Sequence, residues 1–192
     1  MAYAPAVLAA RVLPRSRVVT VALVVTFALL TALAAQISIP LGFTPVPITG
    51  QTFAVLLSGA VLGARAGAAS QLLYVGMGAI GLPFYAEQRG GWEVVTGATG
   101  GYLIGFVFAA AAVGYLAELR QDRRFATSVG AFLSGNLVIY LFGVPGLMVV
   151  LDTTLEEALI LGLVPFIPGD LLKLAAASAL LPTAWKLLGE RR

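Results

Sequence analysis

The sequence has 192 residues, of which 59% are hydrophobic and 11% charged, with a formal net charge of +3 and a mean hydropathy of +0.96. Soluble domains contain about 45–50% apolar and about 25% charged residues, so a water-soluble fold of this length could not bury so much apolar surface. The absence of Cys and His excludes disulfides, thiol nucleophiles, histidine bases and the commonest zinc ligands. We therefore predict one membrane domain over residues 1–192, without a catalytic site, metal site or cofactor.

Six apolar stretches are long enough to cross a bilayer as α-helices, each of which needs about 20 residues. The stretches are uninterrupted and show no period-two alternation, which favours an all-α, six-helix bundle over a barrel. Only Arg65 separates the second from the third stretch, so these two could instead form one bent hairpin. A further stretch, Ala158–Val164, is too short to cross and is predicted to lie at the surface or to be re-entrant. The six predicted spans are Val18–Ile37, Pro47–Ala64, Ala66–Leu82, Gly100–Ala117, Thr127–Val150 and Gly169–Leu188.

Lysine and arginine are distributed unevenly between the two sets of span ends. One set carries only Arg89, with Lys173 just inside the last span. Because cytoplasmic loops are enriched in these residues, the bias predicts that both termini are cytoplasmic. The cations lie between apolar stretches and form no patch, so we expect no nucleic-acid partner. The other set of ends carries Arg11, Arg15, Arg17, Arg65, Arg120, Arg123, Arg124, Lys186, Arg191 and Arg192.

Two features near the N-terminal half are candidates for contacts with other molecules. On the first predicted helix, Ala28 and Ala32 are four residues apart, a spacing that lets a second helix approach closely, either in a partner or within the bundle. The segment Pro40–Gln51 contains three prolines, which predict an extended external loop. Thr49 and Gln51 at its end could face a ligand, or could satisfy backbone groups that proline leaves unpaired.

The external loop after the third predicted span is rich in glycine and aromatic residues. Glycine permits tight turns, and aromatic side chains can cover an apolar ligand. Arg89 is the one external cation outside a span and lies between Glu87 and Glu93, so it is either a ligand contact or a solvated ion-pair partner. The aromatic candidates are Tyr85 and Trp92 in this loop and Tyr74 and Tyr102 in the predicted spans before and after it. Trp92 and Tyr102 could instead anchor the chain at the membrane interface.

The last predicted span holds the charged residues that the bilayer tolerates least. Asp170 and Lys173 are three residues apart and so lie on one helix face, at the outer end of the span. Ionisable groups within spans cost about 2.5–3.5 kcal/mol on insertion scales and usually face a cavity or a partner. The pair could therefore bind a ligand, or Asp170 could cap the helix with Lys173 as its ion-pair partner.

The chain carries no GxxxxGK[ST] element, so it cannot bind and hydrolyse ATP in the P-loop manner. If a solute is pumped against a gradient, the energy must come through a partner protein. A membrane enzyme is disfavoured because it would need a nucleophile and base or a metal site.

Four segments together resemble the successive motifs of the BioY family, the biotin-specific substrate-binding subunits of energy-coupling factor transporters. The resemblance covers roughly residues 18–188 in the right order. One departure is Arg89, where members of the family often have Asn, and another is Ala98, where they commonly have Pro. The segments are Thr44–Gln51, Gly78–Phe84, Thr99–Phe106 and Phe166–Lys173.

The resemblance implies a multi-pass protein of a prokaryotic plasma membrane that captures biotin at the outer face. It implies that Asp170, Lys173 and Arg89 face the ligand. It also implies that Ala28 and Ala32 dock on a transmembrane coupling protein linked to two ATPase subunits. A self-sufficient secondary vitamin transporter, with Asp170 as its proton-sensitive group, is the alternative.

Overall fold

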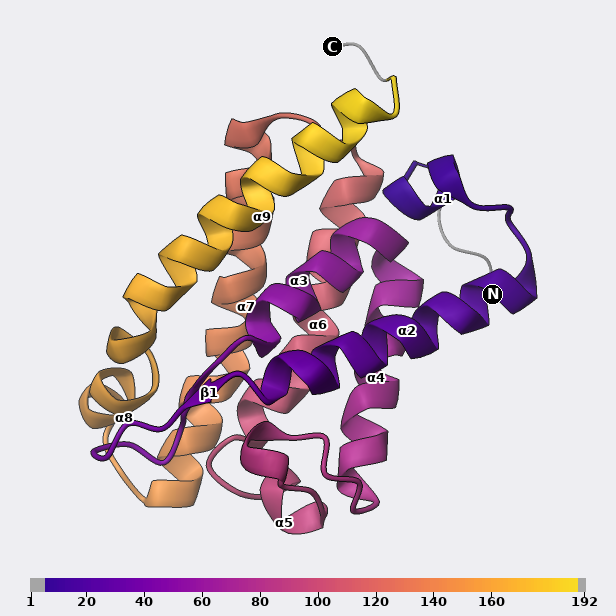
Figure 1. The fold of residues 1–192 in the computed structure, drawn as a ribbon. Coiled ribbons are helices and arrows are strands. Elements are labelled where there is room, and N and C mark those ends of the chain that lie inside the picture. The colour runs from indigo at the N-terminus through magenta and orange to yellow at the C-terminus, as the bar shows by residue number, and fades with distance from the viewer. Residues whose placement is uncertain (1–5, 190–192) are drawn as a thin grey trace.

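The computed structural model describes residues 6–189, which fold into a bundle of helices (Figure 1). Most of the described chain is helical, in agreement with the predicted class, and the only strands in residues 6–189 are two of two residues each. The elements are α1 (Leu8–Val12), α2 (Arg17–Ala35), β1 (Ser38–Ile39), β2 (Ile48–Thr49), α3 (Gln51–Leu62), α4 (Ala64–Ala79), η1 (Ala86–Gln88), α5 (Trp92–Val95), α6 (Gly100–Glu118), α7 (Phe125–Leu151), α8 (Leu155–Gly162), η2 (Val164–Phe166) and α9 (Ile167–Leu187).

Four helical stretches of the described chain are long and apolar enough to cross a membrane. They are α2, α6, α7 and the run from Leu155 to Leu187 that contains α8, η2 and α9. Only 28% of the apolar stretch of α2 is buried inside the protein, so most of its side chains face outward, where lipid takes the place of water. The protein is therefore a polytopic membrane protein, as its composition predicts.

The second and third predicted spans are two separate helices, and both are shorter than predicted. α3 has 12 residues and α4 has 16, which correspond to about 18 Å and about 24 Å against a hydrocarbon core of about 30 Å. Gly63 joins them with a φ of 84°, a conformation that favours glycine. α4 then packs closely on α3, because a Cβ on Gly67 would lie 2.7 Å from the Cα of Gly59.

The segment between α2 and α3 is extended, as its prolines predict, and its two ends pair. β1 and β2 form an antiparallel pair in which Ser38 is opposite Thr49. The predicted surface segment near residue 158 is the short helix α8, which begins with a capping box between Thr154 and Glu157. At eight residues α8 is too short to cross a bilayer, and η2 leads from it directly into α9.

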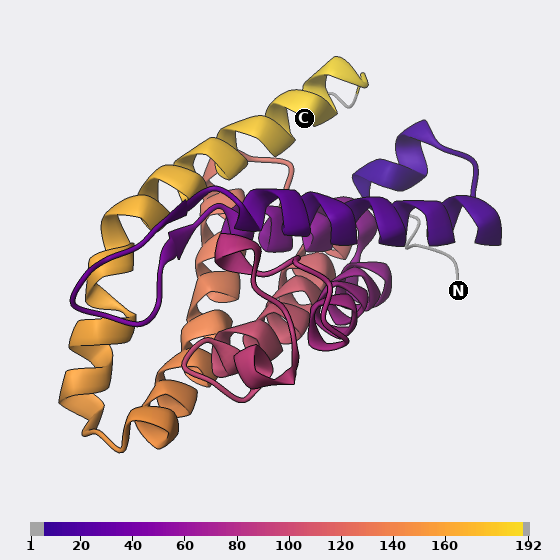
Figure 2. The same ribbon diagram turned by 60° about the horizontal axis from the view of Figure 1, so that its bottom comes forward.

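Different turns, loops and helix ends lie at the two ends of the bundle. At the upper end in Figure 1 lie α1, the α6–α7 turn and the end of α9. Arg11 Nη2 donates to the carbonyl of Leu188 at 3.4 Å, and Arg123 Nη2 donates to the carbonyl of Ala6 at 2.7 Å. At the other end lie the loops at 40–47 and 80–99 and helix α8, and loop 40–47 lies beside α8 in both Figure 1 and Figure 2. Thr44 Oγ1 fastens that loop by donating to the carbonyl of Leu161 at 2.9 Å.

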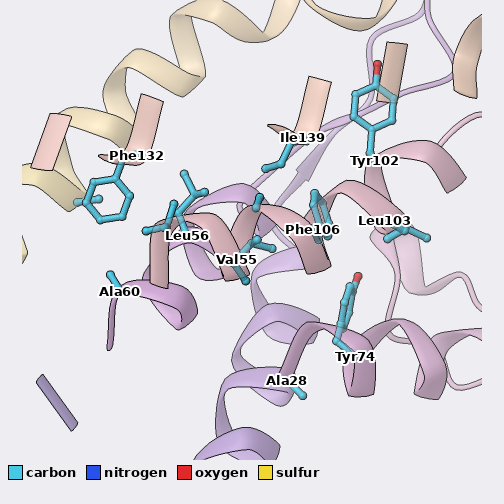
Figure 3. Packing of buried hydrophobic residues seen from close by; sticks show 14 of the residues in the cluster. Ala28, Val55, Leu56, Ala60, Tyr74, Tyr102, Leu103, Phe106, Phe132 and Ile139 are labelled. Carbon is cyan, nitrogen blue, oxygen red and sulfur yellow. The ribbon is translucent and has the colours of Figure 1, made fainter. Parts of the chain in front are cut away.

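Helix α6 is central and packs against α3, α4 and α7. Figure 3 shows the shared core, in which Val55 of α3, Phe106 of α6 and Ile139 of α7 lie close together. Small residues allow this approach: a Cβ on Gly59 would lie 2.3 Å from the carbonyl oxygen of Ala110 in α6. At the loop end of the bundle, residues of α3, α6 and α7 line a cavity instead.

Candidate ligand-binding cavity

A cavity of about 270 Å³ opens at the loop end of the bundle. Its mouth is formed by the loops at 40–47 and 85–89, and its walls by α3, α6, α7 and the η2–α9 segment. It lies where helices meet and is lined by apolar side chains with a few polar groups, which is typical of small-molecule sites. The lining residues are Pro40, Thr44, Pro45, Val46, Pro47, Thr49, Gln51, Thr52, Tyr85, Ala86, Glu87, Arg89, Val94, Thr99, Tyr102, Leu103, Phe106, Asn136, Ile139, Tyr140, Phe166, Asp170 and Lys173.

Asp170 and Lys173 form an ionic cluster in the cavity wall, from one face of α9. Lys173 Nζ lies 2.8 Å from Asp170 Oδ1, and Tyr140 of α7 donates its hydroxyl proton to Asp170 Oδ2. Lys173 Nζ also donates to Thr52 Oγ1 at 2.6 Å and to the carbonyl of Thr49 at 3.2 Å. The intrahelical ion pair considered from the sequence is therefore present. Asp170 does not act as the N-cap, because α9 begins after Phe166 without a side-chain cap.

A second chain of hydrogen bonds supports the wall from behind. Thr49 Oγ1 donates to Gln51 Oε1 at 2.8 Å, and Gln51 Nε2 donates to the Tyr74 hydroxyl. Tyr74 is fully buried outside the lining, and its ring meets that of Tyr85 edge-on at 5.7 Å. Tyr85 lines the cavity, donates its hydroxyl proton to the carbonyl of Val75 at 2.7 Å, and has a pKa raised to about 12 by burial. Tyr74 therefore orients Gln51 and Tyr85 from behind the wall.

The remaining aromatic wall comes from α6 and α7. Tyr102 donates its hydroxyl proton to the carbonyl of Gly162 in α8 at 2.7 Å, and its ring meets that of Tyr140 edge-on at 6.4 Å. A Cβ on Gly162 would lie 2.2 Å from that hydroxyl oxygen, so only glycine fits there without a shift. Tyr102, labelled in Figure 3, thus holds α8 against the bundle while its ring faces the cavity.

Arg89 lies at the mouth and is exposed. Within residues 6–189 its guanidinium makes no ion pair or hydrogen bond, so the pairing with Glu87 or Glu93 considered from the sequence is not observed. The turn that carries it is held by Gln36, whose Nε2 donates to the carbonyl of Tyr85 at 3.2 Å and whose Oε1 accepts from the amide of Gln88 at 3.2 Å. Among the residues that the structure describes, Arg89 is therefore an unpaired cation on a turn that Gln36 anchors.

Three of the predicted contact residues do not line the cavity. Trp92 begins α5, is 67% exposed and does not line the cavity. Ala28 and Ala32 are buried against the bundle, where α2 packs on α3 and α4. They occupy the internal packing position that the sequence left open, and their contact with a partner stays a prediction, as does the contact of Trp92 with a ligand.

Several lining residues were missed from the sequence. Thr52 and Tyr140 complete the ionic cluster, but each lies in an apolar stretch whose inward face is unknown until the neighbouring helices are placed. Asn136 offered a clearer signal, because a carboxamide in the middle of a predicted span is costly unless it faces a cavity or a partner.

An apolar helix bundle that encloses a polar-floored cavity beneath loops at one end defines a class of protein, the membrane-embedded binding protein for a small solute. The BioY family model matches residues 9–190, and the chain belongs to the BioY family. It is a multi-pass membrane transport protein and not an enzyme, as predicted.

Curated relatives and a solved structure agree with this membership. The chain is 41% identical over 165 residues to a biotin transporter BioY of Thermotoga maritima, which covers 86% of this chain and 95% of the relative. It is 37% identical over 160 residues to a biotin transporter BioY of Rhizobium etli, which covers 80% and 85%. The fold resembles the crystal structure of the S-component for biotin from an ECF-type ABC transporter, with a TM-score of 0.79 and 27% identity over 88% of this chain and 92% of that one.

Proposed function

We propose that this protein binds biotin at the outer face of a prokaryotic plasma membrane and releases it to the cytoplasm. The observation that carries the proposal is the Asp170–Lys173 ion pair, which faces a cavity in a bundle whose core is mostly apolar. Asp170 is buried and Lys173 is half-buried within an apolar span, where charged groups are costly unless they face a cavity or a partner. The biotin transporters among the relatives support the choice of solute.

Biotin combines a cyclic urea, an apolar bicyclic ring with an aliphatic tail, and a carboxylate. In the proposed complex, Asp170 accepts a hydrogen bond from a urea N–H, and Lys173 or Arg89 engages an oxygen of the ligand. The rings of Tyr85 and Tyr102 pack against the apolar portion. Gln51, Thr49 and Tyr74 keep this wall in place through the hydrogen bonds that join them.

Calorimetric titration of biotin into the detergent-purified protein tests this function. We expect Asp170→Ala and Lys173→Ala each to weaken binding about 10- to 100-fold, because each removes one half of the ion pair that faces the ligand, and a buried ligand group left unpaired costs about 1–3 kcal/mol. The exposed Leu172→Ala on the same helix is the matched control and should retain wild-type affinity. Wild-type affinity in both charge variants, or no biotin binding by the unmodified protein, would reject the assignment.

For the membrane topology, we propose six crossings with both termini in the cytoplasm. The end of the bundle that holds α1, the α6–α7 turn and the end of α9 is its basic end, because it carries Arg11, Arg120, Arg123, Arg124 and Lys186. The positive-inside rule assigns this basic end to the cytoplasm and so supports the arrangement. α3 and α4 would together form the second and third crossings, with local thinning of the bilayer to match their length. Single cysteines introduced next to each terminus into this cysteine-free chain should react only with membrane-permeant thiol reagents in intact cells. Labelling by an impermeant reagent would sink this topology.

For energy, we propose a transmembrane coupling protein with two ATPase subunits, because the sequence contains no P-loop of its own. Replacing Ala28 and Ala32 with Leu tests the predicted contact with this coupling protein. Because both side chains are buried, the change also disturbs the packing of α2. A loss of uptake therefore counts as a coupling defect only if the affinity for biotin is unchanged. The competing secondary transporter predicts that a protonophore abolishes uptake at constant ATP. Depletion of ATP at constant proton gradient should abolish it in the coupled system.

A further inference from the structure

Asn136 of α7 is a buried polar side chain to which the site described so far gives no role. It is 6% exposed and lines the cavity on the same helix face as Ile139 and Tyr140, which lie three and four residues further on. Its carboxamide makes no hydrogen bond within the described chain, residues 6–189. Because Asn136 lines the cavity, its amide is available to a ligand, and a ligand group that pairs with it avoids the cost of about 1–3 kcal/mol that an unpaired buried polar group carries.

The direction of each helix places Asn136 at the bottom of the cavity. α3, α6 and α9 run from the loop end towards the basic end, and their last lining residues are Thr52, Phe106 and Lys173. α7 runs the opposite way, and its first lining residue is Asn136. It therefore lies about one helical turn, or about 6 Å, deeper than Tyr140.

Hydrogen-bond accounting shows which groups can serve a ligand at this depth. The ammonium of Lys173 has three N–H donors. All three have partners in the protein, at Asp170 Oδ1, Thr52 Oγ1 and the carbonyl of Thr49. Asp170 uses one lone pair on each oxygen, for Lys173 and for Tyr140, and so can still accept. A ligand carbonyl at the floor therefore needs a donor other than Lys173.

We propose that Asn136 recognises the cyclic urea of the ligand, with its Nδ2 donating to the urea oxygen and its Oδ1 accepting from the adjacent N–H. A carboxamide presents one donor and one acceptor on the same edge, which complements one edge of a urea. Asp170 accepts from the second urea N–H. The ring system then enters first, and the carboxylate remains near the mouth, where Arg89 has no partner in the described chain. This inference rests on the proposed function.

Two ligands separate urea recognition from general packing. Biotin carries the urea, whereas 2-iminobiotin carries a protonatable guanidine in its place and so offers donors where the urea oxygen accepts. In calorimetric titrations, we expect Asn136→Leu, of similar volume, to weaken biotin binding about 10- to 100-fold. Ser134→Ala is the matched control, because Ser134 is half-buried on the same helix, bonds only to the carbonyl of Ala131 and does not line the cavity. It should retain wild-type affinity.

Asn136→Asp tests the same contact without a change of shape. It removes both donors and adds an acceptor, so we expect the ratio of the Kd for 2-iminobiotin to the Kd for biotin to fall at least about tenfold relative to wild type. Elution volume and unfolding temperature check that each variant is folded, and this ratio decides the matter if Asn136→Leu does not fold. An unchanged ratio, or wild-type biotin affinity in folded Asn136→Leu, overturns the inference while the proposed function stands. Failure of the unmodified protein to bind biotin overturns both.

Discussion

The two ends of α9 carry similar chemistry in different surroundings. At its start, Asp170 pairs with Lys173 and accepts from a tyrosine. At its end, about 22 Å further along the helix, Trp185 Nε1 donates to Oδ2 of Asp122 at 2.6 Å. Arg123 stacks over the Trp185 ring at 3.5 Å from its centroid, and its Nε lies 3.5 Å from Asp122 Oδ1. Each end thus joins an acid, a cation and an aromatic donor.

The two charged clusters differ in whether they border the cavity. The Asp170 cluster borders the cavity, whereas Asp122 is 2% exposed and Trp185 3% exposed, and neither lines it. The second cluster ties the α6–α7 turn, the end of α9 and, through Arg123 and Ala6, the N-terminal segment into one unit. A buried ion pair is therefore no indication of a binding site by itself, and the adjoining cavity makes the distinction.

The largest expected effect would test the structural role of the second cluster. Trp185→Ala should lower the free energy of unfolding by about 3–5 kcal/mol, because it empties a buried indole site and leaves Asp122 without its donor. Denaturant unfolding in detergent measures this loss, with the exposed Leu187→Ala on the same helix as the control. Biotin affinity of the folded variant should stay within about twofold of wild type. A loss of affinity beyond about tenfold in folded protein would mean that the two ends are coupled.

A smaller effect would separate the mouth of the cavity from its floor. Arg89→Gln should weaken biotin binding only about two- to five-fold, because an exposed charge contributes about 0.2–1 kcal/mol. The difference should shrink in high salt, since exposed charges are screened. Titrations in low and high salt measure it, and Glu93→Gln, an exposed change on α5 outside the lining, is the control. A loss of affinity of about 50-fold that does not depend on salt would assign the main ionic contact with the ligand to Arg89. It would contradict the expectation that Asp170 and Lys173 contribute more to binding than Arg89.

The smallest effect concerns pH. Burial raises the pKa of Asp122, while the hydrogen bond from Trp185 and the charge of Arg123 oppose that shift. Because the folded pKa lies above the unfolded one, the stability that this carboxyl contributes is fully present below the unfolded pKa and is lost as pH rises through the folded pKa. Asn at this position keeps an acceptor for Trp185 and cannot ionise. The unfolding free energy of Asp122→Asn minus that of wild type should therefore increase from about pH 4 to about pH 8. If this difference in unfolding free energy fell as pH rises, the claim that burial disfavours the ionised form of Asp122 would be wrong.

The sequence predicted several elements well because the bilayer imposes their length. The predicted spans Val18–Ile37, Gly100–Ala117 and Thr127–Val150 agree with α2, α6 and α7 to within about two residues at each end. The second and third spans were predicted too long, since the prolines extend residues 48–49 into β2 and the chain leaves α4 at Ile80. Asp170 and Lys173 stood out as charges three residues apart in an apolar stretch, and both line the cavity.

By itself, the sequence determined the membrane class of this protein, its long helices and the charged pair, because apolar length and intramembrane charge are properties of the chain alone. Only the tertiary structure decided which polar residues share the cavity. Asn136 and Tyr140 lie on α7 and Thr52 lies on α3, and their meeting with the charged pair of α9 depends on how these three helices rotate and cross. The same packing buried Ala28 and Ala32 and left Trp92 outside, since a helix face acquires its role only from the neighbour that it meets.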